Sequence, residues 1–231
     1  MKKNRSKVFS AAAYLMLSVI IVNGGENKVA LEGAKIGQWT MDYTAALAEA
    51  KKSELPLLLN FTGSDWCGWC KLMDKNVFSQ KEWQDYAAKN MVLVTLDSPR
   101  DKSIVPEKYV SRNVELKQKF GVEGYPTYIV LDYDGQTTLG QLGASRETTS
   151  TSFIGEVLSA LKTGQSSLKA YAIAHPDKIE ALKASIQAFK SNKKALSDWI
   201  QTEPTRNQEN MKKFAKFNED IRTSEEALSK F

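Results

Sequence analysis

The chain has 231 residues, of which 42% are hydrophobic and 26% are charged. This composition excludes disorder of the whole chain and is sufficient for one well-packed domain with an accessory segment. The formal net charge is +5, but residues 1–22 contain four basic residues and no acidic ones. Subtracting those four charges leaves +1, which gives no electrostatic reason to expect binding to nucleic acid or to a membrane surface.

The N-terminus has the pattern of a secretory signal. Its basic residues precede an apolar run of 15 residues, at positions 8–22. That run is shorter than the ~20 residues that a membrane-spanning helix needs. We therefore expect residues 1–22 to be a cleaved signal peptide, with an uncleaved membrane anchor as the alternative. In both cases the main domain is expected outside the cytoplasm, either periplasmic or secreted.

After a polar linker at residues 23–38, the chain alternates between helical and strand patterns. Residues 42–52 carry apolar side chains at three- to four-residue spacing, which predicts a helix. Residues 55–61 and 91–97 are short apolar runs, which predict buried strands. Between them, residues 70–89 keep helical spacing and predict one further helix.

The pattern continues with a connection at residues 98–113 and a helix at 114–120. It then predicts the two strands of a hairpin at 127–132 and 137–142, and a final helix at 149–162. Gly121 is a helix-ending signal, and Asp134 with Gly135 is a hairpin-turn signal. The order α-β-α-β-α-β-β-α predicts an α/β fold with a mixed central sheet and helices on both faces.

Residues 163–231 show no strand pattern. Apolar residues recur at helical spacing in 179–200 and in 211–231, with a polar stretch between them. We therefore expect the domain at residues 39–162 to carry an α-helical C-terminal extension, organised as an αα-hairpin. Its apolar stripes could dock on the domain, pair with each other or form a partner surface. His175 lies in a loop or helix-capping context, and we expect no catalytic role for it.

The two cysteines of the chain, Cys67 and Cys70, lie in the segment GSDWCGWCK between a predicted strand and a predicted helix. As a structural staple this pair would constrain little, because in the chain-entropy model a disulfide stabilises more when it closes a longer loop. A zinc site commonly needs four ligands, and the one histidine, His175, is far away in the sequence, so no metal is expected. A redox pair fits best, because the free N–H groups at a helix N-terminus favour a thiolate.

The order of the two cysteines predicts a division of labour. Cys67 comes first and is expected to be the more exposed, attacking sulfur. Cys70, one turn further on, is expected to point inward and to resolve the mixed disulfide. Lys71 adds a positive charge nearby, although a solvated helix face is the ordinary place for such a residue.

Two segments resemble the thioredoxin superfamily. WCGWCK is similar to the active-site signature of that family, and KFGVEGYPTYIVLDYDG, at residues 119–135, is similar to the segment that leads into its cis-proline strand and hairpin. The resemblance covers residues 39–162 and looks most like the extracytoplasmic branch. It implies a thioredoxin-like fold, a disulfide between Cys67 and Cys70, and no organic cofactor.

The resemblance also implies roles at individual positions. Cys67 matches the nucleophile and Cys70 the resolving thiol. Trp66 matches the tryptophan that flanks the active site, and Tyr125 and Pro126 match a cis peptide packed against the disulfide. The positions implied to support catalysis or to bind substrate are Trp66, Gly68, Trp69, Lys71, Tyr125 and Pro126.

Two departures from the family pattern are informative. Thioredoxins carry a buried aspartate in the strand before the motif, and the matching residue here is Asn60. Because an amide is no general base near neutral pH, water or a carboxylate such as Asp65 or Asp74 would have to move the proton of the resolving cysteine. By position alone, Asp65 reads as a turn residue and Asp74 as a surface helix residue. Trp69, between the cysteines, adds no charge, and its ring could contact a substrate peptide.

We therefore expect an exported thiol–disulfide oxidoreductase that exchanges disulfides with cysteine-containing proteins. It would need an electron-donor or re-oxidising partner protein, and the sequence leaves the direction of electron flow open. One alternative is a non-catalytic thioredoxin-fold binding module that acts through its C-terminal helices, which the replacement at Asn60 favours. Another is a redox sensor whose C-terminal helices respond to the oxidation state of the cysteines.

Overall fold

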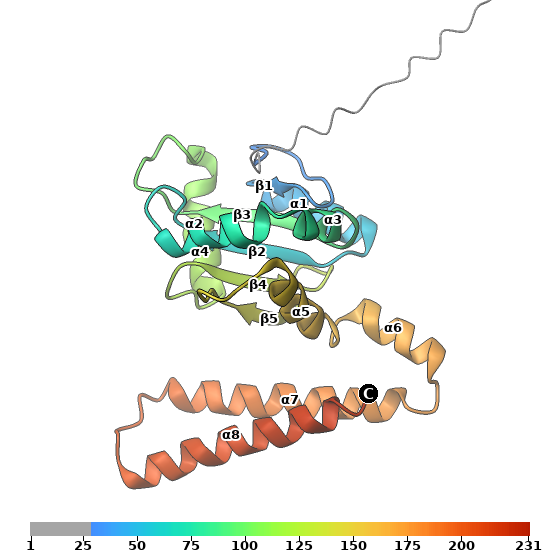
Figure 1. The fold of residues 1–231 in the computed structure, drawn as a ribbon. Helices are drawn as coiled ribbons and strands as arrows, with labels where there is room; N and C mark the ends of the chain where they lie inside the picture. Colours follow the sequence, from blue (N-terminus) through green and yellow to red (C-terminus); the bar gives the residue numbers. More distant parts are fainter. Residues whose placement is uncertain (1–28) are drawn as a thin grey trace, which may run out of the picture.

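The computed structural model describes residues 29–231; the predicted signal segment lies outside them. A five-stranded mixed sheet is covered by helices on both faces and is followed by three C-terminal helices (Figure 1). The strands are β1 (Trp39–Thr40), β2 (Leu57–Thr62), β3 (Val92–Asp97), β4 (Thr127–Leu131) and β5 (Thr138–Leu142). The predicted mixed sheet is thus confirmed, and the sequence pattern missed the two-residue strand β1.

The strand order is β1-β3-β2-β4-β5. Strands β1, β3 and β2 are parallel, β4 is antiparallel to β2, and β5 is antiparallel to β4. Strands β3 and β4 are buried throughout and β2 almost so, as expected for strands covered on both faces. Ala30 and Ile36 form isolated bridges with Thr40 and Val92. Part of the segment expected as a linker is therefore attached to the edge of the sheet.

The helices of the domain are α1 (Tyr43–Ser53), α2 (Gly68–Met73), the π-helix η1 (Asp74–Phe78), α3 (Lys81–Asn90), α4 (Glu107–Lys119) and α5 (Ser150–Leu161). Helix α1 begins at Tyr43 because the carboxylate of Asp42 accepts the N–H of Ala45 at 3.0 Å. Apolar residues of α1 and α4 pack on one face of the sheet, and those of α2, η1, α3 and α5 pack on the other.

An aromatic cluster forms the core on the second face. The ring of Phe78 lies 5.3 Å from Trp83, 5.4 Å from Tyr128 and 5.6 Å from Phe153, in edge-to-face contacts. Trp83 is 1% exposed and belongs to this core. This cluster fixes η1 and α3 against the sheet and thereby positions the preceding helix α2.

The prediction of a single helix at residues 70–89 is wrong, because η1 and a two-residue break divide this segment. The N–H of Ser79 donates to the carbonyl of Asp74, five residues earlier, which widens the last turn of η1. The wider turn allows two consecutive residues, Val77 and Phe78, to be buried together. Helical spacing alone could not reveal this, because each piece keeps a pattern close to that of an α-helix.

The predicted loop at 98–113 and helix at 114–120 also need correction. Helix α4 begins at Glu107, directly after Pro106. Its buried side chains are Tyr109, Asn113 and Leu116, and the amide nitrogen of Asn113 donates to the carbonyl of Asp97 at 3.1 Å. The polar Asn113 interrupts the apolar stripe, so the pattern hid the first half of the helix.

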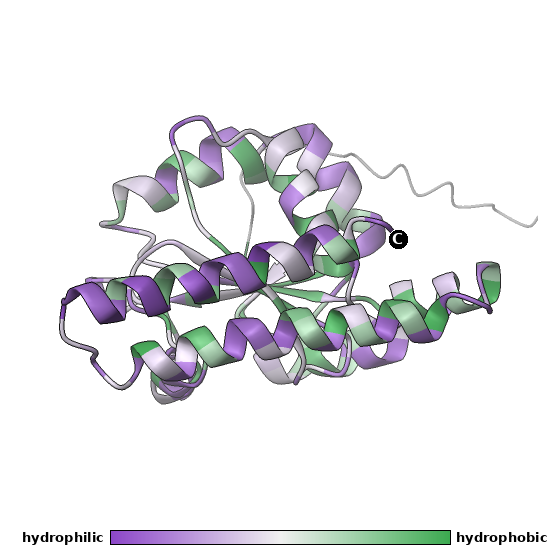
Figure 2. Cartoon of the chain, turned by 90° about the horizontal axis from the view of Figure 1, so that it is seen from below, coloured by the Kyte–Doolittle hydropathy of each residue, from purple (hydrophilic) through white to green (hydrophobic). Residues whose placement is uncertain are grey.

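The C-terminal region contains α6 (Gln165–Ala174), α7 (Ile179–Ile200) and α8 (Gln208–Leu228), and the pattern had not separated α6. Helices α7 and α8 lie along each other and away from the sheet (Figure 1). Figure 2 shows hydrophobic and hydrophilic residues interspersed along both helices. Their seam contains the buried side chains of Leu182 and Ile186. No helix within residues 29–231 is long and apolar enough to cross a membrane.

Helix α6 connects the helix pair to the domain. The N–H of Gln165 donates to the carboxylate of Asp132 at 2.8 Å, and Lys169 forms an ion pair with Glu54 at 3.2 Å. His175 ends α6, where its N–H donates to the carbonyl of Tyr171. His175 therefore lies at a helix end, within the loop or capping context expected, although it ends α6 and does not start a helix.

Candidate active site

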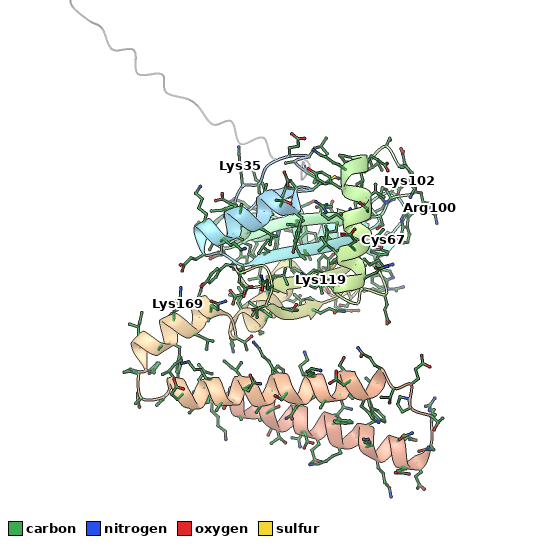
Figure 3. All side chains as sticks on the ribbon, turned by 180° about the vertical axis from the view of Figure 1, so that it is seen from behind. Lys35, Cys67, Arg100, Lys102, Lys119 and Lys169 are labelled. Carbon is green, nitrogen blue, oxygen red and sulfur yellow. A yellow bond between two sulfur atoms is a disulfide. The ribbon has the colours of Figure 1, made fainter. Side chains whose placement is uncertain are left out.

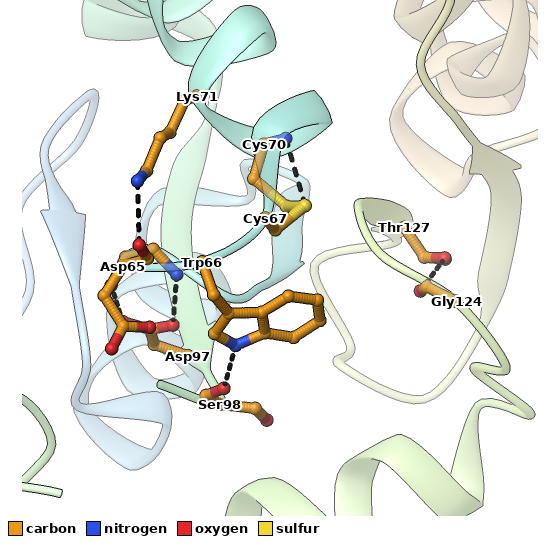
Figure 4. The surroundings of a disulfide bond; sticks show 10 residues. Asp65, Trp66, Cys67, Cys70, Lys71, Asp97, Ser98, Gly124 and Thr127 are labelled. Atoms are coloured by element: carbon orange, nitrogen blue, oxygen red, sulfur yellow. Dashed lines mark hydrogen bonds between the residues drawn. A yellow bond between two sulfur atoms is a disulfide. The ribbon is translucent and has the colours of Figure 1, made fainter. Parts of the chain in front are cut away.

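Cys67 and Cys70 form a disulfide at the point where the chain passes from β2 into α2 (Figure 4). Cys67 is the N-cap of α2, and its Sγ accepts the N–H of Cys70 at 3.1 Å. Gly63 accepts the N–H of Cys67 at 2.8 Å and so turns the chain after β2. A side chain at Gly63 would lie 2.4 Å from the indole of Trp66, so this close approach requires glycine.

The expectation that Cys67 is the more exposed cysteine is wrong for this disulfide-bonded structure. Cys67 is 5% exposed and Cys70 is 7% exposed. The chain makes a tight turn from Gly63 to Trp66 directly before Cys67, and Cys70 lines a pocket on the sheet side of α2. The position of Cys67 at a helix terminus did not predict that its side chain would be so little exposed.

Exposed aromatic side chains surround the largely covered disulfide. Trp66 is 38% exposed and Trp69 is 44% exposed. The indole N–H of Trp66 donates to the carbonyl of Ser98 at 2.9 Å, and its ring meets that of Tyr125 edge to face at 5.6 Å. The guanidinium of Arg146 lies 6.0 Å from the ring centroid of Trp69, a cation–π contact. The surface around the disulfide is therefore aromatic with cations at its rim.

The Tyr125–Pro126 peptide bond is cis, directly before β4. The segment from Gly124 to Thr127 lies across from the disulfide in Figure 4, and the hydroxyl of Thr127 donates to the carbonyl of Gly124 at 2.9 Å. The hydroxyl of Tyr125 bonds Ser98 at 3.1 Å. The structure thus brings the cysteine motif and the proline segment together.

Asp65 and Lys71 secure the loops around the motif. The carboxylate of Asp65 accepts the N–H groups of Arg100 and Asp101 at 2.9–3.0 Å. The hydrogen bond from Asp101 is the main cause that holds the pKa of Asp65 below its usual value. The ammonium group of Lys71 donates to the carbonyl of Asp65 at 2.8 Å (Figure 4). The loop after β3 is therefore part of the site, because it contacts both Trp66 and Asp65. The sequence pattern did not reveal these contacts.

Asn60 lies on the central strand beneath α2. Its register partners are Thr95 on β3 and Tyr128 on β4, so these three side chains form a row across one face of the sheet. A pocket of about 210 Å³ separates this region from the helix, and its lining includes Asn60, Cys70 and Asp74. Asp74, expected on the outer surface of a helix, therefore also faces the site.

Comparison with known proteins places this geometry in a family. Residues 43–157 match the family described as a thioredoxin-like domain. The disulfide bond reductase DsbH of Chlamydia pneumoniae is 34% identical over 125 residues, which cover 54% of this chain and 73% of that protein. The chain belongs to the thioredoxin-like family. Its fold is the thioredoxin-like fold, with α7 and α8 as additional C-terminal helices.

Two further matches support the same assignment. The thioredoxin-related protein DsbJ of the same organism is 34% identical over 96 residues, which cover 42% of this chain and 27% of that protein. A solved structure titled DsbH oxidoreductase is 32% identical, covers 60% of this chain and 95% of that one, and has a TM-score of 0.51. Together with the Cys67–Cys70 pair, these relationships identify the chain as a thiol–disulfide oxidoreductase.

Proposed function

We propose that this protein reduces disulfide bonds in cysteine-containing proteins outside the cytoplasm. The direction is supported by its relationship to a protein named as a disulfide bond reductase, over 73% of that protein's length. The location is supported by the signal-like pattern of residues 1–22. In this function Cys67 is the attacking thiolate and Cys70 is the resolving thiol.

The observation that carries the proposal is the position of the Cys67 sulfur at the N-terminus of α2. The N–H of Cys70, one of those that no helical carbonyl uses, already points at this sulfur at 3.1 Å. In the reduced enzyme the same donor would stabilise a negative charge on Cys67. The Cys67 thiolate would attack a substrate disulfide and release one substrate cysteine. Cys70 would then displace the second one and close the Cys67–Cys70 disulfide.

Substrate would approach over Trp66, Trp69 and Tyr125. Because the disulfide is largely covered, only a chain that docks closely between these rings can reach Cys67. Gly68 has open space where a side chain would project, which leaves room for such a chain. Pro126, which has no N–H, lies directly before β4, and in this function the backbone of the neighbouring Tyr125 would pair with an extended substrate.

A reductase that works in an oxidising compartment must be reduced again after each cycle. The Cys67–Cys70 disulfide is the form that a donor protein would reduce, and no organic cofactor is needed for thiol exchange. The same aromatic surface would receive both substrate and donor, since both must reach Cys67. We therefore expect a redox partner protein in addition to the substrates.

The test is a disulfide-reduction assay with insulin and dithiothreitol. The wild-type protein should accelerate the reaction, and Cys67→Ser should lose the acceleration completely. Ala215→Ser, on the exposed face of α8, is a control that should keep full activity. Equal behaviour of wild type and Cys67→Ser would refute the proposal. The reduction potential decides the direction: a value near about −270 mV supports reduction, and one near about −120 mV supports disulfide donation.

The redox-sensor alternative depends on the C-terminal helices. Met211 and Phe214 on α8 are 59% and 45% exposed, so this region has apolar surface to offer. However, α7 and α8 lie well away from Cys67 (Figure 3). Hydrogen exchange in α7 and α8 should therefore be the same in the oxidised and the reduced protein. A clear change on reduction would favour the sensor instead.

A further inference from the structure

The pocket on the sheet side of α2 contains a polar atom that requires a partner. Asn60 Oδ1 is buried and accepts no hydrogen bond from any group in residues 29–231. Leaving such an acceptor unpaired is destabilising, so a buried oxygen of this kind is normally hydrogen-bonded to protein or to water. The pocket of about 210 Å³ in front of it has room for water, since ~10–15 Å³ of this kind of volume already holds one molecule. Its lining also offers the hydroxyls of Thr62, Ser64 and Thr95.

Cys70 and Asp74 face the same pocket from one side of the helix. The N–H of Asp74 donates to the carbonyl of Cys70, so the two residues lie one turn apart. Side chains at this spacing are neighbours on a helix surface, about 5–6 Å apart at their Cβ atoms. The negative charge of Asp74 also acts on the hydroxyl of Tyr128, the register partner of Asn60: burial raises the pKa of Tyr128, and Asp74 adds to the rise. Asp74 therefore shares the pocket with Cys70 and Asn60 and acts electrostatically on Tyr128.

We propose that Asp74 accepts, through water held by Asn60 in this pocket, the proton that Cys70 loses when it resolves the mixed disulfide. This inference rests on the proposed thiol–disulfide exchange and assigns one of its proton transfers. Asn60 cannot take the proton because its side chain is an amide. It can instead hold the water that connects the two groups. Asp74 would then be a positioning residue that acts on Cys70 through water.

Asp65 and Asp97, the other carboxylates close to the motif, do not fit this role (Figure 4). Neither of them lines the pocket. Asp65 binds the N–H groups of Arg100 and Asp101, and Asp97 accepts hydrogen bonds from the N–H and the hydroxyl of Ser64. The titratable groups that line the pocket are Cys70, Lys71 and Asp74. Tyr128 does not line it but is affected by the charge of Asp74. Lys71 is directed to the carbonyl of Asp65 and carries no acceptor for a proton. Asp74 is the one carboxylate in this set.

The step balances as follows. The Cys70 thiol gives its proton to water as water gives one to the Asp74 carboxylate. The resulting Cys70 thiolate attacks Cys67 Sγ, so the Cys67–Cys70 bond forms while the bond from Cys67 to the substrate sulfur breaks. The enzyme cysteines are oxidised and the substrate cysteines are reduced by two electrons. The departing substrate thiolate takes a proton from solvent, and Asp74, which is exposed on its outer side, returns its own to solvent.

The test separates the two chemical steps with oxidised glutathione as the substrate. Reduced protein is mixed with this disulfide, quenched with acid at successive times and weighed by mass spectrometry. The glutathione adduct on Cys67 reports the first step, and its disappearance reports resolution by Cys70. Asp74→Asn should form the adduct at the wild-type rate but resolve it about tenfold or more slowly at pH 7. The deficit should shrink as the pH approaches the ordinary thiol pKa of ~8.5, because Cys70 then needs no internal base.

Two variants make the result specific. Asp85→Asn removes a carboxylate of the same type from the exposed face of α3, where it pairs with Lys81, and should resolve the adduct at the wild-type rate. Adding Asn60→Asp to Asp74→Asn places an acid on the pocket from the strand side and should restore most of the resolution rate. A merely structural role of Asp74 would predict neither the pH-dependent deficit nor this rescue.

A measurement on the unmodified protein covers the case in which Asp74→Asn does not fold. The carboxyl ¹³C resonance of Asp74 should differ between the oxidised and the reduced protein, whereas that of Asp85 should not. The inference would be overturned if the Asp74 resonance is the same in the oxidised and the reduced protein. It would also be overturned if Asp74→Asn resolves the glutathione adduct at the wild-type rate from pH 6 to pH 9. In both cases a normal adduct on Cys67 would leave the proposed function intact. Absence of that adduct in Cys70→Ser, which cannot resolve it, would refute the proposed function itself.

Discussion

The sheet domain and the C-terminal helix pair differ in how they bury apolar surface. The domain covers both faces of its sheet, and large side chains such as Trp83 and Phe153 are 1% and 0% exposed. Helices α7 and α8, with 22 and 21 residues, are the longest in the described chain, yet their buried residues are Leu182, Ile186 and Ser224. Helix length therefore says little about where the packing energy of this protein lies.

The difference assigns the two regions different tasks. Thiol exchange needs a cysteine pair held in a fixed geometry, and the domain provides this with α2 anchored by η1 and the aromatic cluster. The helix pair packs mainly against itself and is attached through α6. The redox site should therefore be insensitive to the helix pair, while the stability of the domain should depend on its aromatic core.

The largest effect on stability is expected from truncating that core. Trp83→Ala should lower the free energy of unfolding of the domain by about 3–5 kcal/mol, because it leaves a cavity among closely packed rings. Trp199→Ala, in the half-buried seam of α7 and α8, should cost about 1–2 kcal/mol. Urea unfolding followed by circular dichroism measures both. Equal costs would mean that the helix pair is packed as tightly as the domain.

Breaking α7 tests whether the regions are independent. Ala188→Pro, at an exposed position inside the helix, should destabilise it by about 3 kcal/mol through the lost backbone hydrogen bond and a steric clash. Helical circular dichroism should fall while insulin reduction stays at the wild-type rate. Ala188→Gly is the milder control, at about 1 kcal/mol. Loss of reductase activity in the proline variant would show that the helix pair is part of the catalytic unit.

The smallest effect concerns the entry to α1. The N–H of Ala45 is the main cause that lowers the pKa of Asp42, with a further contribution from the N–H of Gly33. Because the folded-state pKa is the lower one, Asp42 stabilises the fold above its unfolded-state pKa and ceases to do so as the pH falls through the folded value. Asp42→Ala should therefore cost about 1 kcal/mol at pH 7. The difference from wild type should shrink as the pH falls below the unfolded-state pKa of about 3.9.

A control at the same position isolates the charge. Asp42→Asn keeps a side-chain oxygen that can cap α1 but carries no charge, so at pH 7 its stability should lie between those of wild type and Asp42→Ala. The midpoints of urea unfolding at pH 7 and pH 3 measure the stability of wild type, Asp42→Ala and Asp42→Asn. If Asp42→Ala loses as much stability at pH 3 as at pH 7, the ionised carboxylate is not what stabilises the start of α1.

The strands and the chemistry of the site were predictable because local residue identity encodes them. β2 and β3 are short apolar runs, and the disulfide and the cis peptide implied by the resemblance are both present. The start of α4 was not predictable, because Asn113 on its buried face bonds a carbonyl of β3. The π-helix η1 before Ser79 and the low exposure of Cys67 also depend on tertiary packing. The pocket between Asn60 and Asp74 joins a strand to a helix and leaves no local pattern.

The most direct test of the redox site is to trap its intermediate. Cys70→Ser, reduced and then mixed with a disulfide-bonded protein such as insulin, should accumulate a stable mixed disulfide, and peptide mass spectrometry should place the link at Cys67. Cys67→Ser, treated in the same way, should accumulate none. A link that forms equally well through Cys70, or no link in either variant, would contradict the assignment of Cys67 as the attacking thiolate at the N-terminus of α2.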